Sequence, residues 1–261
     1  MTIPYFQVDA FSSRVFSGNP AGVCPLEHWL PDEVMQNIAA ENNLSETAFF
    51  TSDAQGIHLR WFTPRIEVDL CGHATLAAAF VLFSEMGRKE ETIRFQTKSG
   101  ALTAQRRGEI IELDFPAWKA KRCPFPEHLA RALGGEPREV LKTRDYIAVF
   151  GMPGEVAALR PDFRLLERLD CLGVIATAPD REVDFVSRCF APRAGIPEDP
   201  VTGSAHCSLI PFWGERLAKT EMFARQISGR GGEIWCRRLG VRVGIGGRAA
   251  IYSRGKLEIP M

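Results

Sequence analysis

Apolar and polar side chains alternate along several short segments of the chain, a pattern that is typical of half-buried strands. Near the N-terminus, apolar Phe6 and Val8 alternate with polar Gln7 and Asp9. Residues 16–23 break the alternation with a cluster of turn-forming residues. The further strands that the pattern predicts are 46–52, 57–63, 93–97, 101–105, 110–115, 225–228, 233–238 and 241–245.

A helical period replaces the alternation in residues 31–43. Met35, Ile38 and Ala39 fall on one face of this segment, which starts with proline and two acidic residues. Asn43 is a typical helix stop. The segment is therefore predicted to be an amphipathic helix that buries one side.

Two more helices are expected to be buried. Residues 74–86 follow Gly72 and are apolar on every face, and a helix of this kind must be surrounded by protein. Residues 204–218 follow Gly203 in a similar way, although Pro211 is expected to bend or shorten the first turns of that helix.

The segment that leads into each buried helix, the corner, has a similar sequence in both places. Residues 60–72 read RWFTPRIEVDLCG, and residues 188–203 read RCFAPRAGIPEDPVTG. In each copy, the glycine that ends the corner lies 28 positions before a glycine in a turn, Gly100 or Gly231. The first corner spans 12 positions and the second spans 15, which indicates a three-residue insertion within 195–203. We interpret the pattern as an internal duplication.

The duplication predicts an α+β fold with two pseudo-symmetric halves, each an antiparallel, barrel-like sheet wrapped around a central helix. Residues 1–117 are assigned to the N-terminal half and 118–261 to the C-terminal half. The linker is expected near 116–127, where proline and charge interrupt the pattern. The last strand, about 249–261, is a candidate to return to the N-terminal half.

Composition narrows the class of ligand. The 32 basic and 32 acidic side chains cancel, which gives no support for a nucleic-acid or membrane-surface partner. The longest apolar tract is shorter than the roughly 18 residues of a spanning helix, and the N-terminus does not resemble a signal peptide. Seven cysteines without CxxC spacing are typical of a reduced, cytoplasmic chain. A small-molecule ligand is expected.

Both duplicated corners lead into the start of a helix. A helix N-terminus presents free backbone N–H groups and the positive end of the helix dipole. We therefore expect a carboxylate to bind in a cleft between the halves, with Gly72 and His73 on one wall and Gly203 and Ser204 on the other.

Four blocks in order resemble the signature of the PhzF-like family, the phenazine-biosynthesis type of isomerase. They are FSGNPAGV, LSETAFF, FTPRIEVDLCGHATLAAA and EDPVTGSAHC, and the later segment QISGRGGEIWC also fits. The resemblance covers nearly the whole chain. It implies a diaminopimelate-epimerase-like fold and isomerisation by proton transfer without a cofactor or metal.

The resemblance also implies roles for individual residues. It makes Glu46 the catalytic acid/base, with Asn19 and Cys71 as further candidates for the site. It implies a homodimer and a small carboxylic-acid substrate whose identity does not transfer. The residues that it implies bind substrate are Ser45, Gly72, His73, Asp199, Gly203 and Ser204.

Simpler roles compete with these assignments. Glu46 could be a solvated loop acid, His73 a helix cap, and Asp199 a turn residue before Pro200. Non-metal chemistry is favoured because the histidines and cysteines lack HxxxH and CxxC spacing, which places a metal hydrolase last. A small-acid binding protein without turnover is the non-enzyme alternative.

The leading interpretation is an isomerase in which Glu46 takes a proton from one carbon and returns it to another. Burial in the cleft should raise the pKa of Glu46 toward neutrality, which suits this task. The enzyme alternative is a two-base racemase or epimerase of a small amino or hydroxy acid. In its two-thiol form that mechanism needs a cysteine on each wall, and the second corner has Thr202 where the first has Cys71.

Overall fold

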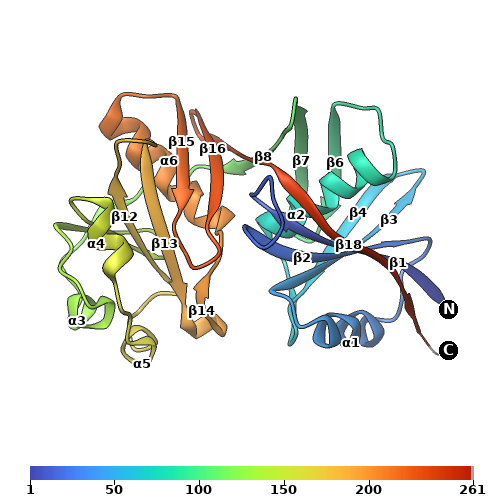
Figure 1. Cartoon of the computed structure of the whole chain (residues 1–261), viewed down its shortest axis with the longest axis horizontal. Coiled ribbons are helices and arrows are strands. Elements are labelled where there is room, and N and C mark those ends of the chain that lie inside the picture. The colour runs from blue at the N-terminus through green and yellow to red at the C-terminus, as the bar shows by residue number, and fades with distance from the viewer. Residues whose placement is uncertain (260–261) are drawn as a thin grey trace. The chain divides into compact units, whose positions relative to one another are not determined.

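The computed structural model describes residues 1–259 of the 261-residue chain. The chain forms two compact units, which are coloured by residue number in Figure 1. Unit 1 comprises Met1–Asp114 and the segment that starts at Gly246, and unit 2 comprises Phe115–Ile245. Each unit combines a sheet with helices, which confirms the α+β class. Within the described residues, no helix has both the length and the apolar character that crossing a membrane requires.

The sheet of unit 1 is mixed. Antiparallel pairs join β18 to β1, β1 to β2, β3 to β4, β6 to β7 and β7 to β8, but β2–β3 and β4–β6 are parallel. The expectation of a purely antiparallel sheet is therefore wrong. A helix lies between the strands of each parallel pair in the sequence, as a parallel crossover requires. The strands are β1 Thr2–Ala10, β2 Asn19–Leu26, β3 Glu46–Asp53, β4 Gly56–Phe62, β5 Glu67–Val68, β6 Thr92–Thr97, β7 Gly100–Arg107, β8 Ile110–Pro116 and β18 Ala249–Glu258.

The crossover helices of unit 1 follow the sequence prediction. Helix α1 covers Asp32–Asn42 and buries Met35, Ile38 and Ala39, and Asn43 ends it in a left-handed conformation. A second crossover helix, α2 (Gly72–Phe80), continues into a π-helical turn and packs against β1, β2, β3, β7 and β18 (Figure 1).

Helix α2, Gly72–Phe80, is enclosed by its unit. Every side chain from His73 to Ala79 is buried, as the all-round apolar pattern predicted. The π-helical turn covers Val81–Glu85. The backbone of Gly247 passes close to the ring of Phe11, and a Cβ added at Gly247 would lie 2.4 Å from that ring.

The sheet of unit 2 is also mixed, with parallel pairs β11–β12 and β13–β15 among antiparallel ones. The strands are β9 Lys121–Arg122, β10 Glu139–Lys142, β11 Tyr146–Val149, β12 Val174–Pro179, β13 Phe185–Ala191, β14 Ile196–Asp199, β15 Glu221–Gln226, β16 Gly232–Leu239 and β17 Arg242–Gly247. The helices are α3 Leu129–Leu133, α4 Pro153–Ala158, α5 Phe163–Leu166 and α6 Gly203–Leu217, with a 3₁₀ turn at Pro192–Ala194.

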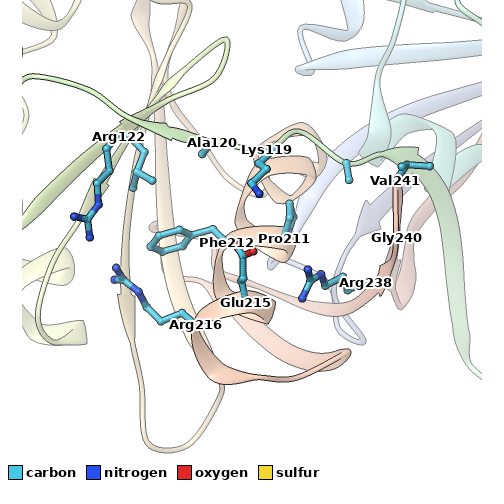
Figure 2. A pocket seen from close by; sticks show the side chains of 12 residues that line it. Lys119, Ala120, Arg122, Pro211, Phe212, Glu215, Arg216, Arg238, Gly240 and Val241 are labelled. Atoms are coloured by element: carbon cyan, nitrogen blue, oxygen red, sulfur yellow. The ribbon is translucent and has the colours of Figure 1, made fainter.

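Helix α6 runs through Pro211 without a break (Figure 2), so the expected shortening of its first turns does not occur. Proline cannot donate a hydrogen bond to the carbonyl four residues earlier, which belongs to Cys207. The backbone N–H of Trp118 donates to that carbonyl instead, at 2.9 Å. The segment after β8 is thereby attached to α6.

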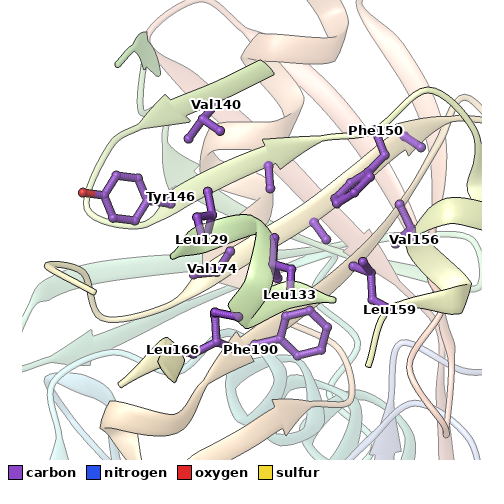
Figure 3. Packing of buried hydrophobic residues seen from close by; sticks show 14 of the residues in the cluster. Leu129, Leu133, Val140, Tyr146, Phe150, Val156, Leu159, Leu166, Val174 and Phe190 are labelled. Carbon is purple, nitrogen blue, oxygen red and sulfur yellow. The ribbon is translucent and has the colours of Figure 1, made fainter. Parts of the chain in front are cut away.

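Unit 2 contains a further core that the sequence analysis did not predict. Figure 3 shows Leu129 and Leu133 of α3 packed with Tyr146, Phe150 and other apolar side chains of the sheet. The helices α3, α4 and α5 that contribute to this core are four to six residues long. Segments of this length are too short to show a helical period.

The two copies of the duplicated corner carry the same ion pair. In unit 1, Arg60 binds Glu67 through two hydrogen bonds of 2.7 and 2.9 Å. In unit 2, Arg188 binds Glu198 through two hydrogen bonds of the same lengths. Each glutamate lies five residues before the glycine that begins the buried helix. The three extra residues of the second copy therefore lie before Glu198, near the 3₁₀ turn Pro192–Ala194.

Candidate active site

The carboxylate of Glu46 is held at the first residue of β3. Its strand runs parallel to β2, and Glu46 lies opposite Ala21. Only 12% of the Glu46 side chain is exposed, whereas a solvated loop acid would be open to water. Asn42, at the end of α1, donates a hydrogen bond to the hydroxyl of Thr47 at 3.1 Å and so fixes this corner.

His73 lies beside Glu46. The Nε2 atom of His73 is 3.2 Å from Oε2 of Glu46, and 7% of the histidine side chain is exposed. The two atoms are close but are not aligned as a hydrogen bond. On the other side of the ring, Nδ1 lies 3.5 Å from Sγ of Cys71. The structure thus brings three of the predicted site residues together in a row.

The histidine in this row is uncharged at neutral pH. Burial lowers the pKa of His73 to about 3, so the contact with Glu46 is not an ion pair. A neutral imidazole carries one proton. When the Cys71 thiol donates to Nδ1, the ring proton lies on Nε2 and faces Glu46.

The first turn of α2 adds donors to this site. Cys71 is the N-cap residue, and no side chain among the described residues caps this end of the helix. Backbone N–H groups at Gly72 and His73 therefore have no capping acceptor, which suits a bound anion. Of the other candidates in unit 1, Ser45 directly precedes β3 and Asn19 is fully buried at the start of β2.

The candidates in unit 2 gather at the start of α6. Asp199 ends β14, and its Oδ2 accepts a 2.6 Å hydrogen bond from the Thr202 hydroxyl. Gly203 begins α6 and Ser204 follows it, and no side chain within residues 1–259 caps this end of the helix. Nη2 of Arg144 lies 3.5 Å from Oγ of Ser204. The sequence analysis missed this cation because it comes from a distant turn.

Gln226 is a second residue that the sequence analysis missed. Its side chain is 1% exposed and fixes the loop before α6 from the end of β15. Oε1 accepts from the backbone N–H of Thr202 at 2.9 Å, and Nε2 donates to the carbonyl of Asp199 at 2.7 Å. The only sequence signal is its place in the segment QISGRGGEIWC, whose residues carry no predicted role.

The next residues of α6 belong to the core, as expected. His206 and Cys207 are buried, and burial raises the pKa of the Cys207 thiol to about 12. This thiol is therefore not a base at neutral pH.

Glu46, Cys71 and His73 are also the residue types that bind zinc. Their ligand atoms lie within 4.8 Å of one another, which makes them the metal-ligand candidates in the described part of the chain. Four-coordinate zinc with bonds of about 2.0–2.3 Å needs ligand atoms roughly 3.3–3.8 Å apart. The 3.2 Å and 3.5 Å contacts of His73 involve different nitrogens of its ring, so they do not define a single three-ligand site.

Known proteins are similar to this chain over nearly its whole length. The family model described as "Phenazine biosynthesis-like protein" matches residues 8–255. An uncharacterized isomerase of Pseudomonas aeruginosa is 51% identical over 99% of this chain and 100% of its own length. The crystal structure of a PhzF-family phenazine biosynthesis protein from Enterococcus faecalis superposes with a TM-score of 0.98. It is 50% identical and covers 99% of this chain and 100% of its own.

More distant structures share the fold alone. A hydroxyproline epimerase of Agrobacterium vitis has a TM-score of 0.63 at 13% identity, over 98% of this chain and 92% of its own. The matched range, 8–255, includes both units.

Proposed function

Because the chain belongs to the phenazine biosynthesis-like family, we propose that it is an isomerase that moves a proton between two carbons of a small carboxylic acid. Relatives with about half of their residues identical are named isomerases. The observation that carries the proposal is the 3.2 Å contact between Glu46 and the uncharged His73, beside an uncapped helix start. No cofactor takes part in the proposed reaction.

The proposed reaction needs one proton carrier. The substrate carboxylate accepts hydrogen bonds from the first N–H groups of α2, which stabilises the negative charge that forms when a neighbouring C–H ionises. Glu46 removes that proton as a carboxylate, and the electron pair moves into the conjugated system of the acid. Protonated Glu46 then gives the proton to another carbon and is regenerated. The imidazole of His73, whose Nε2 lies 3.2 Å from Oε2 of Glu46, is expected to help position the polar groups of the substrate. That the first turn of α6 contributes further donors stays a prediction.

We assign no second base to the proposed reaction. In unit 1, Arg60 pairs across the sheet with Phe49, and Glu46 lies three residues before Phe49. In unit 2, Arg188 pairs across the sheet with Ala176. The residue three positions before Ala176 is Gly173, which has no side chain that could act as an acid or base. The hydroxyl of Thr202 is bound to Asp199 and is too weak an acid to replace a thiol. A single carrier favours a shift of the proton over inversion at one carbon.

Deuterium exchange on a panel of candidate acids tests the proposal. Small unsaturated and amino carboxylic acids are first screened for thermal stabilisation of the protein. Stabilising acids are then incubated in deuterated water with protein dialysed against a chelator, and deuterium on carbon is followed by NMR. The wild type should incorporate deuterium, and Glu46→Gln should reduce the rate by at least about a hundredfold.

Glu41→Gln is the matched control, because Glu41 is an exposed acid on α1 of the same unit. It should exchange at the wild-type rate. Direct return of the same proton by a shielded Glu46 lowers incorporation, so product is also measured. Stabilisation by acids with neither product nor exchange in the wild type would favour the binding-protein alternative. Full activity of Glu46→Gln would overturn the proposed role of Glu46.

A further inference from the structure

A pocket of about 570 Å³ lies in unit 2 beside the second half of α6. Figure 2 shows its walls, which come from the segment after β8, from residues 211–216 of α6 and from the turn at 238–241. We propose that this pocket binds a small organic anion that carries at least two negative charges and an apolar body. The proposal does not depend on the isomerase reaction.

Two arginines form one side of the pocket, and a shared acid holds both. Glu139 accepts a hydrogen bond from Nε of Arg122 at 2.7 Å and from Nη2 of Arg216 at 2.5 Å. Each guanidinium has five N–H donors, so each keeps several for a ligand. Burial raises the pKa of Glu139, but the two arginines outweigh it and the pKa lies below its usual value. The acid therefore stays charged and keeps the arginines in place.

Two more cations approach from the other side. Lys119 and Arg238 line the pocket, and neither side chain has a hydrogen-bond or ion-pair partner in residues 1–259. Glu215 is the acid that lines the pocket beside these four cations. The whole chain is formally neutral, so this cluster is a local excess of positive charge. Like charges around one pocket repel each other, and a bound anion would relieve that repulsion.

The floor of the pocket is apolar. Pro211, Phe212, Leu141 and Val241 contribute to it, and the guanidinium of Arg216 lies 4.6 Å above the ring of Phe212. Figure 2 shows the guanidinium groups of Arg122 and Arg216 to the left of the Phe212 ring, and Lys119 and Arg238 to its right. Cations on opposite sides of an apolar floor suit a molecule with separated anionic groups. The volume is that of a metabolite site.

Binding of defined probes to the whole chain tests this assignment. Phthalate, citrate and pyrophosphate are titrated by calorimetry against chloride at equal ionic strength, because salt alone screens exposed charges. At least one probe should bind at a single site. The double variant Lys119→Gln/Arg238→Gln should weaken its affinity by about tenfold or more, since it removes two charge-assisted contacts.

The control double variant is Arg131→Gln/Arg181→Gln, which removes two exposed cations elsewhere in unit 2. It should bind the probes like the wild type, and so should Glu46→Gln, which separates this pocket from the proposed active site. Equal loss in both double variants, loss in Glu46→Gln alone, or no binding beyond chloride would overturn the proposal. A change in sedimentation of Lys119→Gln/Arg238→Gln without any effect on probe binding would instead indicate a contact between copies of the chain, which also overturns it.

Discussion

The environment of His73 decides which residue in the row of three can change its charge. Burial lowers the pKa of His73 to about 3, so the ring stays neutral through the neutral range. A proton that moves during turnover then belongs to Glu46 or to Cys71, which flank the ring at 3.2 and 3.5 Å. The Cys71 thiol is a weak hydrogen-bond donor, and no second thiol takes its place in unit 2, where the corner has Thr202.

Substitutions at the two ends of this row should therefore differ. We expect Cys71→Ala to keep most of the exchange activity, because Glu46 remains as carrier. His73→Ala should reduce the exchange rate at least about a hundredfold, because the Glu46 carboxylate loses its neighbouring ring and with it the orientation that proton transfer requires. Both variants are assayed in deuterated water, with circular dichroism as the test of folding. An inactive Cys71→Ala beside an active Glu46→Gln would restore the two-base epimerase.

Elements whose sequence has a clear helical or strand period could be predicted. A strand that starts with turn-forming residues and the parallel pairing of strands could not. The starts of α2 and α6 at Gly72 and Gly203 agree with the duplicated spelling of the corners. Strand β2, Asn19–Leu26, was missed because glycine, asparagine and proline at its start are typical of a turn, although of these only Gly18 adopts a left-handed backbone. Parallel pairing was missed because it depends on crossovers, which a strand's own residues do not reveal.

The candidate site was predictable to the same degree. Glu46 and His73 were found through family resemblance, and only the fold places them 3.2 Å apart. Arg144 and Gln226 reach the start of α6 from segments that lie 60 positions before Ser204 and 24 positions after Thr202. No local pattern reports contacts over such separations.

The loop before α6 should depend on Gln226. Gln226→Met keeps the volume but removes the acceptor of the half-buried Thr202 N–H and the donor to the Asp199 carbonyl. An unsatisfied buried group costs about 1–3 kcal/mol, and we expect urea denaturation to show a loss in that range. Gln96→Met is the control, since Gln96 donates to the Gln55 carbonyl at an exposed site and should cost about 0.5 kcal/mol or less. Equal losses would contradict the assigned role.

At the scale of the whole molecule, each unit buries one neutral histidine in its central helix. His73 lies in α2 and His206 in α6. Burial lowers the pKa of His206 to about 4, although its hydrogen bond with the Thr202 carbonyl, at 2.8 Å, opposes the shift. The pKa of His73 is lowered to about 3. The folded chain therefore excludes two protons that the unfolded chain binds below about pH 6.5.

The direction of the pH effect follows from this difference. Above about pH 6.5 both states are neutral at these histidines, so their contribution to stability does not change. Between pH 6.5 and about 4, the unfolded chain binds more protons and the free energy of unfolding falls as pH is lowered. Taking pH 5.0 against an unfolded pKa of about 6.5, each histidine should cost about 2 kcal/mol. Urea denaturation at pH 7.5 and 5.0 should show the loss, and His206→Gln should lose about 2 kcal/mol less between the two than the wild type. His28→Gln, which replaces an exposed histidine, is the control and should show the full loss. If His206→Gln shows the same dependence of unfolding free energy on pH as the wild type, the His206 imidazole of the wild type takes up a proton in the folded chain.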